Sequence, residues 1–115
     1  MKVNQRDVVF LNYLLPNGQF KPHPAVIVST DELYEAKGVY YAVMLSTKAH
    51  NPDFMVTLTP DAFNYPTDTT SFAKCQLLLQ VSDYDIIKRF GSLKAQPFKE
   101  IIDRINEAVF GLGNQ

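Results

Sequence analysis

The chain has 115 residues, of which 46% are hydrophobic and 20% are charged, and its formal net charge at pH 7 is −1. These values are typical of a folded chain with one core, so we expect residues 1–115 to form a single domain. The near balance of charge gives no support to a broad basic surface for nucleic acid, although it leaves room for a local basic cleft.

Cysteine and apolar patterns limit the class of protein further. The lone Cys75 cannot form an internal disulfide, and no group of Cys and His residues has the spacing of a zinc site. The chain start lacks the apolar stretch of a signal peptide, and no apolar run is long enough to span a membrane. We therefore expect a cytoplasmic protein with no membrane, metal or cofactor, and a core this small favours pairing with a second copy.

The first half of the chain predicts three strands. Residues 7–15 are rich in β-branched and aromatic side chains, and Pro16-Asn17-Gly18 follows them as a turn. The apolar run 24–29 predicts a strand that is buried on both faces. Residues 30–36 then predict a short helical turn ended by Gly38, before a central strand at 39–46.

The second half predicts two more strands and a helix. The strands cover residues 54–58 and 71–81, with a loop at 60–70 between them and a helical turn and a tight turn over 82–93 after them. The last element is a helix at 97–110, whose buried side should carry Phe98, Ile101, Ile102, Ile105 and Val109, with Gly111 as its C-terminal cap. The whole pattern predicts a mainly β fold, a small bent sheet or partly closed barrel with a C-terminal amphipathic helix.

Three groups of polar side chains are candidates for a functional site, and the first is the segment Lys21-Pro22-His23-Pro24. Its prolines hold the chain extended, since each fixes its own φ and disfavours a helical conformation in the residue before it. Lys21 and His23 then lie on one side of the chain. A lysine beside a titratable histidine can hold a phosphate and move a proton near neutral pH, although both residues also fit an ordinary loop.

The second group is Ser46-Thr47-Lys48 at the end of the central strand, with His50 two positions further on. Two hydroxyls and a cation at this point can bind phosphate oxygens or orient a ribose hydroxyl. The alternative is a strand end with capping hydroxyls and a solvated lysine.

The third group is Lys74-Cys75-Gln76 within the strand 71–81. The two-residue period of a strand puts Lys74 and Gln76 on one side, where they line a polar groove or form the solvent face of an amphipathic strand. Cys75 then points to the opposite, buried side, which favours a core residue over a nucleophile.

In their order and spacing, the motifs resemble the MazF/PemK family of toxin endoribonucleases over residues 6–110. The family pattern has a Gly-Asp strand, a glycine-containing loop, an Arg-Pro strand, a strand ending in Thr or Ser, a Ser-x-x-x-x-acidic-Gln strand and an Ile-Gly-x-Leu segment. The matching segments in this chain are Arg6-Asp7-Val8-Val9, Pro16-Asn17-Gly18, His23-Pro24-Ala25, Val43-Met44-Leu45-Ser46-Thr47, Ser71 to Leu77 and Phe90-Gly91-Ser92-Leu93.

The resemblance implies a single domain with an SH3-like barrel, a homodimer, and cleavage of single-stranded RNA without metal. In such cleavage the ribose 2′-hydroxyl attacks the adjacent phosphorus, so the site must remove the 2′ proton, stabilise charge on the phosphate and protonate the leaving 5′ oxygen. The resemblance also implies a small antitoxin that covers the RNA groove.

Carried over residue by residue, the resemblance implies a catalytic set of His23, Ser46, Thr47 and Lys74. His23 occupies the position of the family's catalytic arginine before proline, and it can act as acid or base where arginine carries a permanent charge. Ser46 or Thr47 falls on the catalytic hydroxyl position. Lys74 lies near a basic residue of the PemK branch.

The expected RNA-binding residues are Lys21, Lys48 and Gln76. Gln76 stands where the family pattern has an acidic residue, and an amide cannot serve as a base. Two hypotheses therefore stay open: a toxin-like endoribonuclease, and a catalytically degenerate RNA- or protein-binding module on the same barrel.

Overall fold

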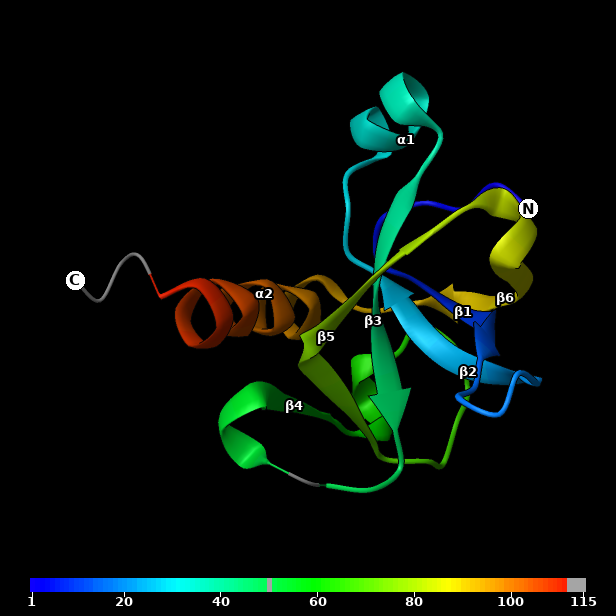
Figure 1. Ribbon diagram of the computed structural model, residues 1–115. Helices are drawn as coiled ribbons and strands as arrows, with labels where there is room; N and C mark the ends of the chain where they lie inside the picture. The colour runs from blue at the N-terminus through cyan, green and yellow to red at the C-terminus, as the bar shows by residue number, and fades with distance from the viewer. Residues whose placement is uncertain (50, 112–115) are drawn as a thin grey trace.

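The computed structural model describes residues 1–49 and 51–111, which form one six-stranded antiparallel sheet in the order β4-β5-β3-β2-β1-β6 (Figure 1). This arrangement confirms the predicted mainly β fold with short helical turns and a C-terminal helix. The strands are β1 (Asp7–Leu14), β2 (Phe20–Ile27), β3 (Tyr40–Ser46), β4 (Met55–Leu58), β5 (Ser71–Val81) and β6 (Ile86–Ser92), the helices are α1 (Asp31–Lys37) and α2 (Ala95–Arg104), and single 3₁₀ turns cover Pro52–Phe54, Pro60–Ala62 and Asp83–Asp85.

The sheet is not closed as a barrel, because within the described residues its edge strands β4 and β6 do not pair with each other. One bridge between Phe63 and Leu93 joins the chain after β4 to the end of β6. Beside it, the Asn64 N–H donates to the Ser92 carbonyl at 2.8 Å. The predicted barrel is therefore present in a partly closed form.

Strand β6 corrects the sequence analysis, which predicted a helical turn and a tight turn in this part of the chain. The helical turn exists, capped by Ser82 through the Asp85 carboxylate, but it ends at Asp85 and residues 86–92 pair with β1. Two register shifts interrupt this pairing. Such bulges break the alternation of buried and exposed side chains, so the two-residue period did not reveal the strand.

Strand β2 extends beyond its partner β3, and this leaves an opening in the sheet. It pairs with β1 over residues 20–26 but with β3 only over residues 25–27. The Leu15 N–H donates to the Gln19 carbonyl, so residue 19 and every second residue after it bond toward β1. The backbone groups of the residues between them, which include 22 and 24, therefore point toward β3. Pro22 and Pro24 have no N–H and cannot donate there. The prolines thus explain why the pairing stops and the opening begins.

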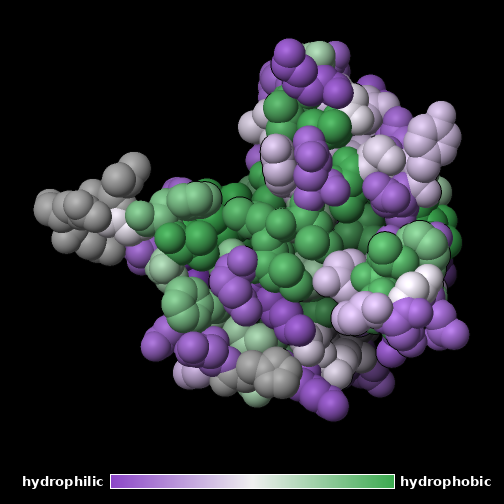
Figure 2. Space-filling view, in the orientation of Figure 1, coloured by the Kyte–Doolittle hydropathy of each residue, from purple (hydrophilic) through white to green (hydrophobic). Residues whose placement is uncertain are grey.

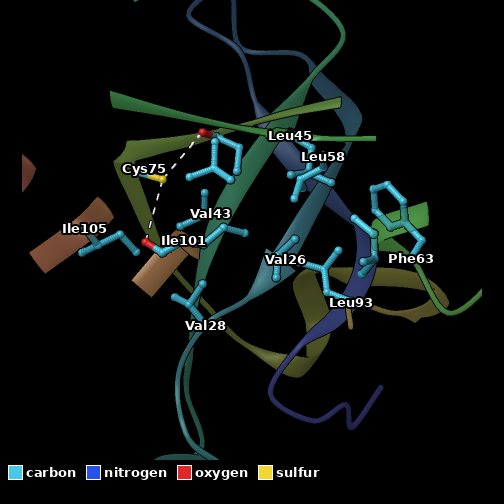
Figure 3. Packing of buried hydrophobic residues seen from close by; sticks show 14 residues of the cluster. Val26, Val28, Val43, Leu45, Leu58, Phe63, Cys75, Leu93, Ile101 and Ile105 are labelled. Carbon is cyan, nitrogen blue, oxygen red and sulfur yellow. Dashed lines mark hydrogen bonds between the residues drawn. The ribbon is translucent and has the colours of Figure 1, made fainter. Parts of the chain in front are cut away.

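The two faces of the sheet carry separate cores. The larger core, seen in Figure 3, packs α2 against the sheet through Ile101, and the π-helical turn after it (Ile105–Phe110) through Ile105. The second core lies on the opposite face and includes Ala25 and Ile27 of β2. Since alternate residues of a strand share a face, His23 lies on the side of the second core, away from α2.

Helix α2 begins at Ala95, two residues before the predicted start, and a π-helical turn over Ile105–Phe110 continues it. Gly111 ends the helix with a left-handed φ of 67°, as the sequence predicted. Arg104 fixes the helix to the loop before β4, because its Nη1 donates to the carbonyls of Pro52, Asp53 and Met55 at 2.9, 3.2 and 3.0 Å.

Arg6 has a left-handed backbone with a φ of 77°, a conformation that glycine adopts most easily. The family pattern that the chain resembles has glycine at this position. Here the conformation is stabilised by hydrogen bonds: the Arg6 N–H donates to the Ile27 carbonyl at 2.8 Å and its Nε to the Leu93 carbonyl at 3.1 Å.

Gly91 of β6 provides the space in which the Tyr65 ring packs, since a Cβ at this position would overlap that ring. We expect Gly91→Ala to lower the free energy of unfolding by about 1–3 kcal/mol, because the ring has to move. Urea denaturation of Gly91→Ala in the wild-type and Tyr65→Ala backgrounds measures this. The cost should shrink when the ring is absent, and an equal cost in both backgrounds would contradict the steric explanation.

Candidate functional site

The opening between β2 and β3 forms a groove of about 510 Å³. Six of the seven site residues predicted from the sequence line it, and they come from β2, the end of β3 and the middle of β5. The groove is lined by Tyr13, Lys21, Pro22, His23, Pro24, Met44, Leu45, Ser46, Thr47, Lys48, Lys74 and Leu77. Side chains more than 50 residues apart in the chain thus meet because β3 lies between β2 and β5.

His23 is half-buried in the groove, opposite Leu11 of β1. Its ring meets that of Tyr13 edge to face, with 5.5 Å between the ring centroids and 80° between the planes. Burial lowers the pKa of His23 below its ordinary value of 6.5, and the positive charges of Lys21 and Lys74 lower it further. The imidazole is therefore largely uncharged at neutral pH and able to accept a proton.

The end of β3 supplies the hydroxyl groups. The Lys48 N–H donates to the Ser46 Oγ at 3.1 Å, a local bond that turns the chain out of the strand. Thr47 and Lys48 are exposed at the same point. A phosphate in the groove would meet these hydroxyls and the lysine together. His50, the remaining residue of this group, lies outside the described residues.

The pairing of β5 with β3 is irregular beside the groove, near Lys74 and Gln76. The register against β3 shifts between Val43, which pairs with Leu78, and Leu45, which pairs with Ala73. A regular ladder would need fewer residues on β5 over this interval, so the extra residues form a bulge. Lys74 lines the groove, whereas Gln76 is exposed and does not line it. Ala73 and Cys75 are buried while Lys74 and Gln76 are not, in keeping with the predicted alternation, but only Lys74 lines the groove.

The groove is a local basic site on a chain of nearly neutral charge. Lys21, Lys48 and Lys74 all line it, and none of them forms an ion pair within residues 1–49 and 51–111. No acidic side chain of the described chain lines it either. Unpaired ammonium groups around a half-buried imidazole create a positive potential that attracts an anion such as a phosphodiester.

Cys75 lies in the core beneath the groove, as the sequence predicted. It is fully buried, and Figure 3 shows its thiol directed at the carbonyls of Ala73 and Ile101, with distances of 3.7 and 4.0 Å. Burial raises the pKa of the Cys75 thiol to about 11. A thiol that stays protonated inside the core is no nucleophile.

In the part of the chain that the structure describes, no cluster of three or more His, Cys, Asp or Glu side chains has the arrangement of a metal site. Nor does any described helix have the length and apolar character needed to cross a membrane.

Sequence reasoning missed the apolar wall of the groove, namely Tyr13, Met44 and Leu77. The position of Tyr13 could have been predicted from the turn at residues 16–18, because a hairpin in this register sets Tyr13 opposite Lys21. Leu77 had no such signal, because the bulge in β5 changes which residues face the groove.

The fold is a small open β sheet covered by a C-terminal helix, and its groove holds lysines, hydroxyls and a histidine where β2 and β3 separate. Both features fit the class of toxins that the motifs resemble. The chain belongs to the family of PemK-like, MazF-like toxins of type II toxin–antitoxin systems, whose family model matches residues 4–109. The resemblance drawn from the motifs over residues 6–110 is thereby confirmed. The search of curated proteins gives no match.

Solved structures show the same fold. An endoribonuclease in complex with its cognate antitoxin, from a mycobacterial species, superposes with a TM-score of 0.75 at 15% identity and covers 99% of this chain and 98% of its own. MazF in a MazE–MazF structure from Deinococcus radiodurans gives 0.75 at 14% identity, covering 94% and 96%. The Mycobacterium tuberculosis toxin MazF-mt6 gives 0.71 at 14% identity, covering 90% and 95%. At these identities the likeness concerns the fold.

Proposed function

We propose that this protein is a toxin endoribonuclease that cleaves single-stranded RNA without a metal ion. The observation that carries the proposal is the groove at the end of β2 and β3, where a half-buried, largely uncharged His23 lies among three unpaired lysines. This combination provides a proton acceptor and positive charge for a phosphodiester in one place. Membership of the toxin family supports the same conclusion.

In the proposed mechanism His23 accepts the proton of the ribose 2′-hydroxyl as its oxygen attacks the adjacent phosphorus. The bond between phosphorus and the 5′ oxygen breaks, and the Lys74 ammonium donates a proton to that oxygen. Ser46 or Thr47 holds the phosphate by hydrogen bonds, while Lys21 and Lys48 bind the flanking phosphates. The products are a 2′,3′-cyclic phosphate and a 5′-hydroxyl end, and no water or metal is consumed in the step.

The direct test incubates the purified protein with single-stranded RNA in the presence of EDTA. We expect cleavage with EDTA present and cyclic phosphate ends on the products. RNA that stays intact, or cleavage that stops when EDTA is added, would overturn the proposal. Double-stranded RNA of the same sequence is the control, because the 2′-hydroxyl in a duplex lacks the freedom to line up with the leaving oxygen.

The pH dependence of cleavage tests the role of His23. If neutral His23 is the base, kcat/KM should rise with pH through an inflection below 6.5, because protonated imidazole cannot accept the 2′ proton. Removing a positive neighbour raises the pKa, so in Lys74→Met we expect this inflection at higher pH, together with a rate roughly 10²-fold lower. Rate profiles between about pH 5 and 8 measure both effects.

Lys37→Met is the matched control for that experiment, because Lys37 is an exposed lysine of α1 and does not line the groove. It should change neither the rate nor the inflection. If the inflection in Lys74→Met stays at the wild-type pH, the charge of Lys74 does not shift the pKa of His23, and this part of the proposal is wrong.

The proposed partners are a small antitoxin and a second copy of the chain. The toxins compared above include structures with their antitoxin, so we propose such a partner here. We also propose a cytoplasmic location, as expected from the sequence. Hydrophobic side chains gather in the middle of one face, between α2 and the strands β3 and β5 (Figure 2), and a hollow beside Leu14 and Phe20 is also apolar. Light scattering should give the mass of two chains, and the mass of one would contradict the homodimer.

The second candidate function is a binding module that holds RNA or protein in the same groove without cutting it. Two observations favour it: His23 stands at the family's arginine position, and Gln76, at the acidic position, does not line the groove. This alternative predicts salt-sensitive RNA binding with product lengths unchanged. The cleavage assay with EDTA separates the two candidates.

A further inference from the structure

A second hollow opens on the other face of the sheet, directly behind the candidate site. Its volume is about 330 Å³, and it shares Pro24 and Leu45 with the groove. These two residues lie where β2 and β3 no longer pair, since that pairing covers only residues 25–27 of β2. A chain bound in the groove therefore lies next to this second hollow, which we call the aromatic pocket. Its other walls are Val8, Phe10, Phe63, Tyr65, Pro66, Thr67, Thr69, Ser71 and Phe90.

Aromatic rings dominate the pocket. Phe10 and Phe90 meet edge to face with centroids 4.6 Å apart and planes at 76°. Tyr65 and Phe90 are nearly parallel, with 6.3 Å between centroids and 27° between planes. All three side chains are half-buried, so part of each ring remains open to a ligand. Rings held in this way offer stacking surfaces to a flat apolar group.

The pocket is held open by the fold. The Tyr65 ring packs against the backbone of Gly91, where no other residue leaves room for it, and against Phe63, with 5.2 Å between ring centroids. Phe63 in turn forms the bridge that joins the two edges of the sheet. The ring positions are thus fixed before any ligand binds, which reduces the entropy lost on binding.

Polar groups at the pocket are neutral or positive. Thr67, Thr69 and Ser71 line it, and hydroxyl groups can both donate to and accept from the edge of a base. Lys88 lies over the Phe90 ring, with its Nζ 5.0 Å from the ring centroid. No charged side chain of the described residues lines the pocket itself. A flat uncharged ring with a polar edge and a nearby phosphate matches this chemistry.

We propose that the aromatic pocket binds the nucleobase of a nucleotide next to the scissile phosphate and so contributes to the choice of the RNA sequence that is cut. The inference rests on the proposed function of the groove and extends it to a base-recognition site. Bases of single-stranded RNA stack on Phe and Tyr rings, whereas paired bases in a duplex are not available for this. The pocket therefore also favours single-stranded substrate.

The test uses an RNA that cannot be cut, so that binding is measured whether or not the protein is a nuclease. The probe is a nine-nucleotide oligouridine with 2′-O-methyl sugars and one central 2-aminopurine, whose fluorescence falls when it stacks on an aromatic ring. We expect quenching on binding to the wild-type chain. Tyr65→Leu and Phe90→Leu keep the apolar volume but remove the ring, so they should lose most of the quenching and bind roughly tenfold more weakly.

Two further variants control the test. Tyr65→Phe keeps the ring and should behave as wild type. Tyr84→Leu makes the same kind of substitution at a tyrosine that is 96% exposed and outside the pocket, and it should also leave binding unchanged. Thermal unfolding confirms that each variant is folded. If a folded Tyr65→Leu and a folded Phe90→Leu both retain the quenching and the affinity of wild type, the proposal is overturned.

The second readout is cleavage of RNAs with an abasic site at each position around the mapped cut. We expect one abasic position to lower kcat/KM for wild type and to have no further effect on Tyr65→Leu. If RNA is cleaved but no abasic position shows this coupling to Tyr65→Leu, the base-binding role of the pocket is wrong and the proposed nuclease activity stands. If binding depends on the base but no RNA is cleaved, the base-binding role of the pocket is supported and the proposed nuclease activity is wrong.

Discussion

His23→Ala should lower the rate of RNA cleavage by about 10²–10⁴-fold, the range expected for loss of a general base. His23 is the titratable group of the groove whose pKa is shifted so that it is uncharged at neutral pH, and no other described histidine is present to replace it. Single-turnover cleavage of a labelled RNA measures the effect. Addition of imidazole should restore part of the rate, because the cavity left by the side chain can hold a small base.

RNA affinity is the internal control for this variant. The attraction for phosphate comes from the lysines and not from an uncharged ring, so His23→Ala should bind a 2′-O-methyl RNA about as tightly as wild type, with the same salt dependence. Cleavage at the wild-type rate would remove His23 from the mechanism. Loss of binding together with cleavage would make its role structural.

Asp7→Ala should give the largest loss of stability of any substitution considered, about 2–4 kcal/mol in the free energy of unfolding. The Asp7 side chain is only 4% exposed, and its Oδ1 lies 3.1 Å from the Arg89 guanidinium of β6. Its Oδ2 accepts the Asn4 N–H at 2.7 Å. One carboxylate thus joins the N-terminal turn, β1 and β6, and its loss leaves the Asn4 N–H without this acceptor.

Asp103→Ala is the matched control, since Asp103 also pairs with a cation, Lys99, but the pair is exposed on α2. Solvent screens such a pair, so the loss should be about 0.3–0.5 kcal/mol. Urea denaturation at pH 7 compares the two variants. Equal losses would contradict the conclusion that burial makes Asp7 the important carboxylate.

The elements that the sequence predicted with nearly the right bounds are those with a clear apolar pattern, whereas the strand predicted at 24–29 begins earlier and ends earlier, at Phe20–Ile27. β3 and β5 carry dense apolar runs, and Ile101, Ile102 and Ile105 repeat at helical spacing over α2 and the π-helical turn that continues it, so these elements follow from the pattern alone. β6 carries no such pattern. It becomes a strand because the outer edge of β1 needs a partner, and that requirement is tertiary and not visible in residues 86–92.

The site was predictable to the extent that it rests on motifs. His23, Ser46 and Lys74 were found because prolines, a strand end and a charged residue within a strand mark them locally. Leu77 lines the groove and Gln76 does not, and this difference depends on the bulge in β5. The bulge arises from pairing across the sheet, which the local sequence does not show. The aromatic pocket escaped the sequence analysis for the same reason, since its rings come from β1, the loop before β5, and β6.

The central claim is that the groove cuts RNA by the 2′-hydroxyl route with no metal. The most direct measurement digests one single-stranded RNA with the purified protein in excess EDTA and identifies the product ends. We expect cleavage with 2′,3′-cyclic phosphate and 5′-hydroxyl ends, and no cleavage when the nucleotide 5′ of the cut carries a 2′-deoxyribose. Cleavage that leaves a 5′-phosphate, requires a metal, or proceeds on the 2′-deoxy substrate would contradict it.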